Sequence, residues 1–236
     1  MPDKQDSRKD RISRLGPRAR KTRSRILAAM RDLLTDKEYR AITTAELAKR
    51  AEVNEGLIYH YFKSKDDVFW SVLEEYMIDY IKFIGLSIQG VKGTFNKIRK
   101  FIWANIYILS REHPGGKILL LEVRSNPNYY KTPAFALTVR SRAIGLEIIQ
   151  EGIASGEISE SVNPHAFTST IVGALEHAVL PIITHKKERD LEQLTDQICT
   201  IIFEGIAKKD ALTANLIKKM DKMEKAVKKL KGGTHG

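Results

Sequence analysis

The sequence predicts an all-α protein in which an N-terminal three-helix domain is joined to a larger helical domain. Beyond residue 90, apolar residues recur with the period of an amphipathic helix, and no strand-like alternation competes with them. Breaks rich in Pro, Gly and Asn separate these segments. At 236 residues the chain has room for one small and one larger domain. The long helices are predicted at 95–111, 133–152, 164–180 and 191–206, and the breaks at 114–116, 126–128 and 152–156.

We expect four parts along the chain. Residues 1–17 are predicted to be a disordered basic leader, 18–80 the small domain, and 81–207 the larger domain. Residues 208–236 form a Lys-rich amphipathic extension with apolar residues in 4-3-4-3 spacing. Docking of this extension on its own subunit is the default expectation, while packing across a dimer and contact with DNA remain open. Its apolar residues are Leu216, Met220, Met223, Val227 and Leu230.

The small domain begins with an amphipathic helix whose apolar face covers the helices that follow it. A second helix starts at the capping box formed by Thr43 and Glu46, with Ile42 placed to pack on Leu47. Asn54 is a cap for a third helix, and Ser64 with Asp67 starts a fourth. The expected core residues are Ile26, Leu27, Met30, Leu33, Leu34, Leu47, Ala48, Ala51, Val53, Leu57, Ile58, Phe62, Phe69, Val72, Leu73, Tyr76 and Tyr80.

The second and third helices are short and joined by a tight turn, which is the layout of a helix-turn-helix that offers one helix to the major groove of DNA. The segment from about residue 22 to residue 80 resembles the DNA-binding domain of the TetR family of transcriptional regulators. The run Leu57-Ile58-Tyr59-His60-Tyr61-Phe62 followed by Ser64-Lys65 carries this resemblance. Further matching residues are Ile26, Leu27, Ala28, Ala29, Thr43, Thr44, Leu47, Ala48, Ala51 and Val53.

This resemblance implies the DNA contacts. Phosphate contacts are expected from Thr44, Tyr59, Tyr61 and Lys65. Glu55 is expected to read a C·G pair, because a carboxylate accepts from cytosine N4, and Gly56 allows close approach to the groove. Alternatively, the tyrosines are partly buried aromatics and Glu55 only complements the helix dipole. The set of candidates for this interface also includes Thr43, Asn54 and His60.

The turn departs from the family pattern at Glu52. The family usually has Gly there, because the backbone favours positive φ. A residue other than Gly in that conformation costs about 1–2 kcal/mol. We therefore expect strain at Glu52.

The net charge of +11 is concentrated near the two ends of the chain. Residues 1–25 hold ten Lys or Arg and three Asp, and residues 208–231 hold nine Lys and three acids. The predicted helix-turn-helix has no charge excess of its own, so we expect a basic arm with Arg18, Arg20 and Lys21 to contact DNA in the minor groove. The alternative is a solvated leader.

By resemblance, the larger domain is a ligand-binding and dimerisation domain. A single reading helix covers few base pairs, so a two-fold homodimer on a two-fold operator is expected. The last two helices are expected to form a four-helix interface, although the same residues also suit an intramolecular core. The candidates are Ile171, Gly173, Ala174, Leu175, Ala178, Leu194, Ile198, Ile201 and Ile202.

The ligand pocket is expected among aromatic, aliphatic and cationic residues of the larger domain, each of which also suits a plain core position. The pair Glu176-His177 lies within an apolar stretch and is the best candidate for a buried polar group that faces the pocket, although a satisfied core histidine is commoner. The candidates are Trp103, Tyr107, Arg111, Leu120, Arg124, Tyr130, Arg140, Ile149 and His177.

The run from Leu119 to Asn126 followed by Tyr129-Tyr130 is similar to the fatty-acid-degradation regulators of this family, which respond to long-chain acyl-CoA. We therefore expect a repressor that a small hydrophobic effector, best matched by a long-chain acyl-CoA, releases from its operator. One alternative is a regulator of a multidrug-efflux or aromatic-compound operon. A ligand-independent architectural DNA-binding protein is the alternative from a different class.

Other classes of protein are disfavoured. No paired nucleophile and base, histidine ligand spacing or phosphate-binding glycine loop is recognisable, so no enzyme activity, catalytic residue, metal or cofactor is expected. The apolar stretch around residue 176 is interrupted by Glu176, His177 and Pro181, so no membrane-spanning helix is expected. With no signal peptide recognised and Cys199 as the lone cysteine, a cytoplasmic location is predicted.

Overall fold

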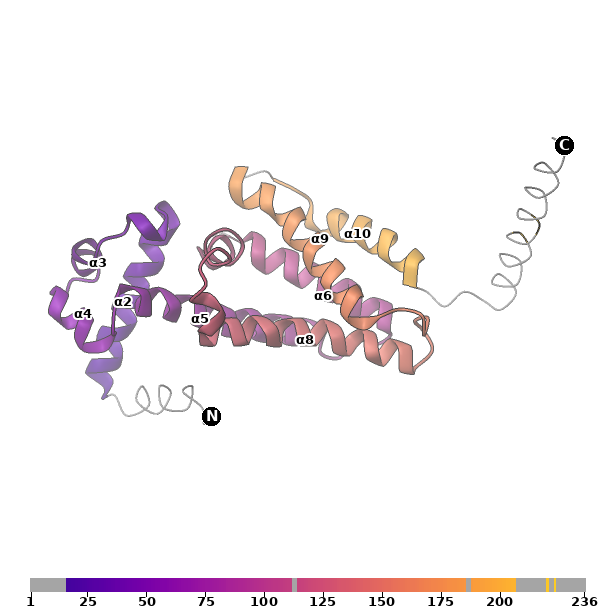
Figure 1. The fold of residues 1–236 in the computed structure, drawn as a ribbon, viewed down its shortest axis with the longest axis horizontal. Coiled ribbons are helices and arrows are strands. Elements are labelled where there is room, and N and C mark those ends of the chain that lie inside the picture. Colours follow the sequence, from indigo (N-terminus) through magenta and orange to yellow (C-terminus); the bar gives the residue numbers. More distant parts are fainter. Residues whose placement is uncertain (1–15, 112–113, 186–187, 207–219, 221–222, 224–236) are drawn as a thin grey trace, which may run out of the picture.

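The computed structural model describes residues 16–111, 114–185 and 188–206, together with Met220 and Met223. The described residues are mainly helical and contain no strand, as predicted. Figure 1 shows two parts: a small N-terminal group of helices, here called the head, and an elongated helical bundle, here called the body. Residues 1–15 of the predicted leader and most of the C-terminal extension lie outside the described residues.

The head consists of α2 (Pro17–Asp36), the 3-10 turn η1 (Tyr39–Ala41), α3 (Thr44–Arg50) and α4 (Glu55–Tyr61). The predicted caps are confirmed: Thr43 Oγ1 accepts from the Glu46 amide at 3.1 Å, and Asn54 Oδ1 accepts from the Leu57 amide at 2.8 Å. Each cap satisfies one of the amides that a helix start leaves without a backbone partner. The Glu46 carboxylate lies 2.5 Å from Lys37 Nζ, and this hydrogen bond lowers the pKa of Glu46.

The core of the head is the one predicted, with two differences. The apolar face of α2 is buried, as are Leu47, Ala48 and Ala51 of the second helix and Ile58 and Phe62 of the third. Leu57 and Val53 are only half-buried, because they lie at the edge of the α3–α4 pair.

The expected basic arm is a helix. Gly16 is the N-cap of α2 and Pro17 occupies its first turn, where proline is favoured because its missing N–H is not needed there. Arg18, Arg20 and Lys21 therefore lie exposed on the first turns of α2 and not on an extended arm. Any DNA contact by these residues must come from a helix end and not from a strand-like segment that enters the minor groove.

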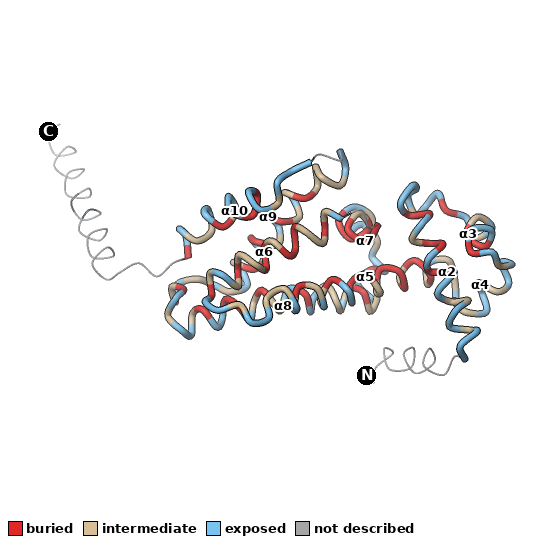
Figure 2. Tube along the Cα trace, turned by 180° about the vertical axis from the view of Figure 1, so that it is seen from behind, coloured by how far each residue is buried: buried red, intermediate tan, exposed pale blue. Residues whose placement is uncertain are grey.

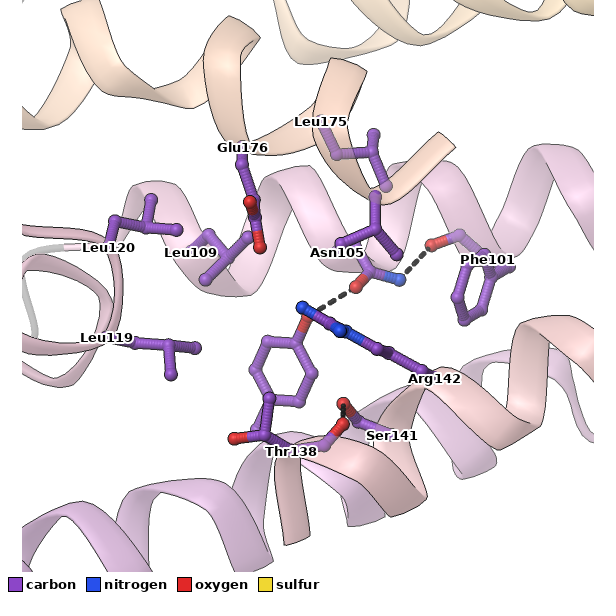
Figure 3. A pocket seen from close by; sticks show the side chains of 12 residues that line it. Phe101, Asn105, Leu109, Leu119, Leu120, Thr138, Ser141, Arg142, Leu175 and Glu176 are labelled. Atoms are coloured by element: carbon purple, nitrogen blue, oxygen red, sulfur yellow. Dashed lines mark hydrogen bonds between the residues drawn. The ribbon is translucent and has the colours of Figure 1, made fainter. Parts of the chain in front are cut away.

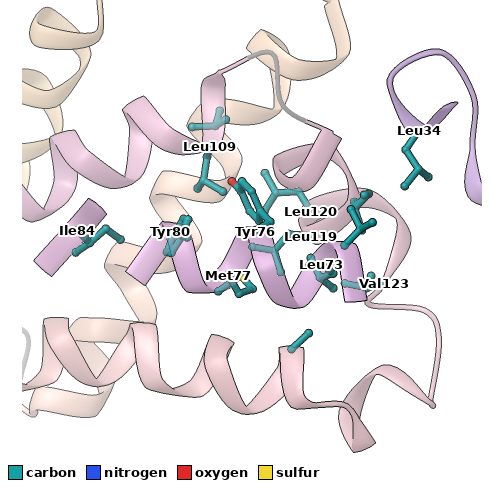
Figure 4. Close-up of a cluster of buried hydrophobic side chains, with 14 of the residues drawn as sticks. Leu34, Leu73, Tyr76, Met77, Tyr80, Ile84, Leu109, Leu119, Leu120 and Val123 are labelled. Atoms are coloured by element: carbon teal, nitrogen blue, oxygen red, sulfur yellow. The ribbon is translucent and has the colours of Figure 1, made fainter. Parts of the chain in front are cut away.

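The body is formed by α5 (Lys65–Ile88), α6 (Thr94–Ser110), α8 (Pro133–Ala154), α9 (Pro164–His185) and α10 (Leu191–Ile206). The boundary expected between residues 80 and 81 falls inside α5, which runs without a break from the head into the body. Its buried residues follow its whole length, and Figure 4 shows several of them packed against side chains from the rest of the body. This helix therefore joins the two parts through one continuous core, which Figure 2 shows as buried positions along α5.

One predicted break and one predicted helix end are wrong. The predicted break at 114–116 is helical: α7 (Pro114–Lys117) leads into the π-helix η2 (Ile118–Glu122), followed by a loop and the 3-10 turn η3 (Tyr129–Lys131). The helix predicted to end at residue 180 continues past Pro181 to His185. Leu180 and Ile183 are half-buried against the core, so packing keeps the helix going where proline removes one backbone hydrogen bond.

The two glycines of α7 permit a close helix contact. A Cβ atom on Gly115 would lie 2.2 Å from Cγ of Tyr76, and one on Gly116 would lie 2.6 Å from the carbonyl oxygen of Leu109. Tyr76 is buried, and its ring packs directly on the α7 backbone. The glycines are therefore required by packing and not by a loop.

By length and composition, α9 is apolar enough to cross a membrane, which the sequence reading did not expect. Only 22% of its most apolar window is buried within this chain. Such a helix is weak evidence for a membrane span, since a helix that packs against a protein partner has the same composition. In the extension, Met220 and Met223 are helical and exposed, so the body of the same chain does not cover these two side chains.

The turn between α3 and α4 has the predicted strain. Glu52 has φ of 54°, and it is the single residue other than Gly with positive φ in the part of the chain that the structure describes. Its carbonyl oxygen accepts from Arg25 Nη2 at 3.0 Å, and this bond does not depend on the side chain at position 52.

Replacing Glu52 with Gly is expected to stabilise the protein. The substitution removes a cost of about 1–2 kcal/mol, and part of that gain is offset by the greater freedom of Gly in the unfolded chain. A rise in Tm of about 2–4 °C follows for a chain of this size. Glu52→Ala is the control, because alanine keeps the strain; an equal rise in Tm for both variants in thermal unfolding would show that the backbone is not the cause.

Gly115→Ala is expected to lower the free energy of unfolding by about 1–3 kcal/mol, because the added methyl group overlaps the ring of Tyr76. The matched control is Gly85→Ala in α5, where nothing lies within 4 Å of the new methyl group. That control is expected to stabilise by up to about 1 kcal/mol through helix propensity. Urea unfolding of both variants measures the difference, and equal stabilities would contradict the packing role of Gly115.

Candidate nucleic-acid interface and ligand pocket

The outer face of the head presents polar side chains from the starts of α3 and α4. Glu55, Gly56, Tyr59 and His60 are exposed, and Tyr59 exposes 54% of its surface. Thr44 Oγ1 lies 3.4 Å from the Tyr59 hydroxyl, which links the first turn of α3 to α4. The Glu55 carboxylate has no hydrogen bond or ion pair among the described residues, so it is open to a donor from outside. Thr43 and Asn54 are exposed beside this face, although their side chains act as helix caps.

The two remaining DNA candidates on this side have structural contacts. Tyr61 is half-buried against the core and meets the edge of the His60 ring at 5.0 Å between centroids. The Lys65 ammonium donates to the carbonyl oxygen of Ile42 and lies 4.4 Å above the ring of Tyr39. Lys65 therefore holds α5 to the segment that precedes α3. Phosphate contacts by both residues stay predictions, next to this structural role.

A cavity lies in the body between α5, α6, η2, α8 and α9, and Figure 3 shows its lining. Its volume is about 30 Å³, which is room for about two water molecules. Apolar side chains form the end near η2, and polar ones form the centre. The lining residues are Tyr80, Phe101, Asn105, Leu109, Leu119, Leu120, Thr138, Ser141, Arg142, Val172, Leu175 and Glu176.

The polar centre is a hydrogen-bonded chain. The Tyr80 hydroxyl donates to Asn105 Oδ1, and Asn105 Nδ2 donates to the Phe101 carbonyl oxygen at 2.7 Å. Burial raises the pKa of Tyr80, so this hydroxyl stays protonated and remains a donor. Arg142 reaches from α8 toward this pair in Figure 3, and its guanidinium has no hydrogen bond or ion pair among the described residues. Arg142 lines the cavity and is also exposed, so its side chain connects the cavity with the protein surface.

Few of the predicted ligand residues line a cavity. Leu120 lines the one just described, and Ile149 lines a second cavity of about 10 Å³. The Glu176 carboxylate faces the first cavity and lies 2.5 Å from Arg124 Nη2, an ion pair that raises the pKa of Arg124. His177 is exposed and does not line the cavity, so the prediction that it is a ligand residue is wrong, and Glu176 is the residue of this pair that faces the cavity.

The other ligand candidates lie outside both cavities. Trp103 and Tyr107 stack on each other at 5.1 Å, and Tyr107 also stacks on Phe83 of α5 at 5.4 Å. Lys100 Nζ lies 3.7 Å from the centre of the Trp103 ring. Arg111, Tyr130 and Arg140 are exposed. Aromatic bulk and isolated charged residues were poor signals for the lining, because they do not identify Asn105, Thr138 and Ser141. Asn105 was detectable as an amide inside an apolar run, four residues after Phe101 on the same helix face.

The dimer candidates separate into two groups. Ile171, Leu175 and Leu194 are buried in the core of their own chain. The others remain exposed or half-buried on the outer faces of α9 and α10, and Ile201 exposes 76% of its surface. This accessible group is Gly173, Ala174, Ala178, Ile198, Ile201 and Ile202.

The cavity adjoins the contact between head and body. Leu119 and Leu120 line the cavity from η2, and Glu122 at the end of η2 accepts from the Tyr39 amide of the head at 3.2 Å. Glu122 Oε1 is buried and has no hydrogen-bond partner among the described residues, which is rare and costly for a carboxylate oxygen. A second contact is made by Glu75 of α5, which lies 2.8 Å from Arg31 Nη1 of α2.

Two features bear on metal binding and on cysteine reactivity among the described residues. The described residues contain no group of three His, Cys, Asp or Glu that is arranged for a metal ion. Burial raises the pKa of the Cys199 thiol to about 11, which is opposite to the shift that activates a nucleophilic cysteine.

Similar proteins agree with this geometry. Residues 26–72 match the bacterial regulatory proteins of the tetR family. The fatty acid metabolism regulator protein of Bacillus subtilis (strain 168) is 25% identical over 184 residues, which cover 78% of this chain and 95% of that protein.

Solved structures extend the likeness to the body. The transcriptional regulator FadR from Bacillus subtilis, solved in complex with stearoyl-CoA, has a TM-score of 0.70 and is 26% identical in sequence. The match covers 78% of this chain and 98% of the FadR chain. The fatty acid degradation regulator FadR from Bacillus halodurans has a TM-score of 0.70 at 20% identity, with 81% and 97% covered, which supports the fold. The head carries the matched segment and the body has the same fold as these regulators. The chain therefore belongs to the TetR family of DNA-binding transcriptional regulators.

Proposed function

We propose that this protein is a homodimeric repressor that a long-chain acyl-CoA releases from a two-fold symmetric operator. The observation that carries the effector is the cavity in the body, which is apolar at one end and has the partner-free guanidinium of Arg142 at its opening. The homologues support a ligand-responsive transcriptional regulator, and the relative solved with stearoyl-CoA supports this kind of effector. We place the protein in the cytoplasm with the DNA that it binds.

DNA binding is assigned to the exposed start of α4. Tyr59 with Thr44 suits contacts to phosphate, and the open carboxylate of Glu55 suits a cytosine amino group in the major groove. The exposed cations Arg18, Arg20 and Lys21 at the start of α2 add attraction to the DNA backbone.

The homodimer is assigned to α9 and α10. Regulators of this family bind operator DNA as dimers. The apolar composition of α9, its low burial and the exposed Ile201 leave a surface that a second copy would cover. Gly173 and Ala174 are small enough for two helices to approach closely there.

The chemistry of the cavity fits an acyl-CoA. Leu109, Leu119 and Leu120 suit an acyl chain, and a guanidinium at the opening suits a phosphate through paired hydrogen bonds. A volume of about 30 Å³ is much smaller than a long acyl chain, so binding requires the surrounding side chains to move. That movement supplies the conformational signal. A hydrophobic drug-like inducer would use the same leucines without needing Arg142, and an architectural DNA-binding protein would need no cavity.

The signal is proposed to pass through η2. An acyl chain that displaces Leu119 and Leu120 moves the helical turn that carries Glu122, and Glu122 holds the Tyr39 amide of the head. The π-helical turn is a rare conformation, and Glu122 Oε1 is buried with no hydrogen-bond partner among the described residues. Both features raise the free energy of this turn, so little binding energy is needed to change its conformation. Lys65 joins Tyr39 and Ile42 to the first turn of α5, which follows the reading helix α4 in the chain, so we propose that movement of Tyr39 is passed to α4 by this route.

The effector assignment predicts that palmitoyl-CoA lowers the affinity for an operator, obtained by selection from random DNA, by at least about tenfold, within the usual range of allosteric coupling. Arg142→Ala is expected to weaken palmitoyl-CoA binding by about tenfold while operator affinity without effector is unchanged. Arg140→Ala, an exposed neighbour outside the cavity, is the control. Release of DNA by palmitoyl-CoA at equal concentrations in all three proteins would exclude Arg142 from the site.

The signalling route predicts a separate effect at Glu122. Glu122→Ala removes the acceptor of the Tyr39 amide, so operator binding is expected to become insensitive to palmitoyl-CoA, with the coupling reduced by about tenfold. Glu122→Gln keeps an acceptor oxygen and is expected to respond. Fluorescence anisotropy of labelled operator DNA with and without palmitoyl-CoA measures both, and a full response in Glu122→Ala would place the route elsewhere.

A further inference from the structure

Two cavities in the described part of the body share one lining residue, Phe101. The second cavity is lined by Ile98, Phe101, Gly145, Ile148, Ile149, Phe167, Thr168 and Ile171. Phe101 is the single residue among these that also lines the first cavity. On α8 the lining continues from Thr138 to Ile149, which is about 17 Å along a helix. The two spaces therefore follow the bundle axis from the η2 end toward the far end of the body.

The position of the Phe101 ring depends on Gly145. A Cβ atom on Gly145 would lie 3.0 Å from Cζ of Phe101 and 3.5 Å from Cγ2 of Thr168. The backbone of Phe101 is held by the hydrogen bond from Asn105 Nδ2, so the ring can move while its main chain stays in place. Figure 3 shows Phe101 at the end of the first cavity, beyond Asn105 and away from Leu119 and Leu120. The ring thus closes the apolar passage into the second cavity.

We propose that Phe101 and Gly145 set the chain length of the ligand that this protein recognises. Once the side chains around the first cavity have moved, a short acyl chain stays on the near side of the ring, whereas a long chain must also turn the ring aside and enter the second cavity. This inference rests on the proposed acyl-CoA effector. It assigns chain-length selection to the residue pair between the cavities, apart from Arg142, which contacts the head group.

The energetic consequence differs between ligands. Each methylene buried in the second cavity strengthens binding by a factor of about four. The cost of turning the ring is paid once, and only by chains long enough to reach it. A wider passage therefore favours long chains over short ones, and a blocked passage removes that advantage without changing the binding of short chains.

The test measures binding of hexanoyl-CoA and palmitoyl-CoA to the full-length protein by isothermal titration calorimetry, without DNA. Phe101→Leu widens the passage and is expected to raise the preference for palmitoyl-CoA by about tenfold. Gly145→Ala places a methyl group against the ring and is expected to lower that preference by about tenfold. Gly85→Ala, the same substitution at a site with open space, is the control and should leave the preference unchanged.

The outcomes separate the two levels of the proposal. Opposite shifts of the chain-length preference in Phe101→Leu and Gly145→Ala support the assignment. Equal changes for both ligands in both variants overturn it and leave the effector class intact. Failure of the wild-type protein to bind either ligand overturns the effector class and this inference together. If circular dichroism shows that Phe101→Leu is unfolded, the comparison of Gly145→Ala with Gly85→Ala decides.

Discussion

The structure depends on the burial of α5 along its whole length. This helix begins in the head, where Ser64 caps it, and ends in the body at Ile88. Its buried residues include Val68 near one end and Ile84 near the other, so head and body share one apolar core. The contact of Tyr76 with the bare backbone at Gly115 brings α7 and η2 against this helix. Because one rigid element links the two parts, a shift on one side of the core changes the position of the other.

Two polar side chains lie inside or at the edge of this otherwise apolar core. Asn105 is 5% exposed and its amide is satisfied by Tyr80 and by the Phe101 carbonyl, which gives the cavity a defined polar centre. Glu122 is less well satisfied, since one of its carboxylate oxygens is buried and accepts no hydrogen bond from the part of the chain that the structure describes. Apolar residues would make both sites more stable. Their presence is consistent with a body that binds a ligand and changes shape, and not with one selected for stability alone.

On the outer surface of the bundle, α9 exposes residues that the core of its own chain does not use. Within α9, Ile171 and Leu175 complete the core of their own chain, while Gly173 and Ala174 on the opposite side stay uncovered. The apolar composition of α9 therefore exceeds what the core of its own chain uses, and in the proposed homodimer a second copy covers the rest. Hydropathy alone does not separate these uses, which explains why the same helix satisfies the criteria for a membrane span.

The sequence by itself determined the helical fold, the caps of the short helices, the family of the head and the strained turn at Glu52, because these depend on local spacing and backbone preference. Only the tertiary structure decided which side chains line the cavity. Glu176 and His177 are adjacent in sequence, but successive residues of a helix point about 100° apart, so one faces the cavity and the other faces outward. Likewise, Lys65 binds the Ile42 carbonyl, a contact that only the packing of α5 on the head creates.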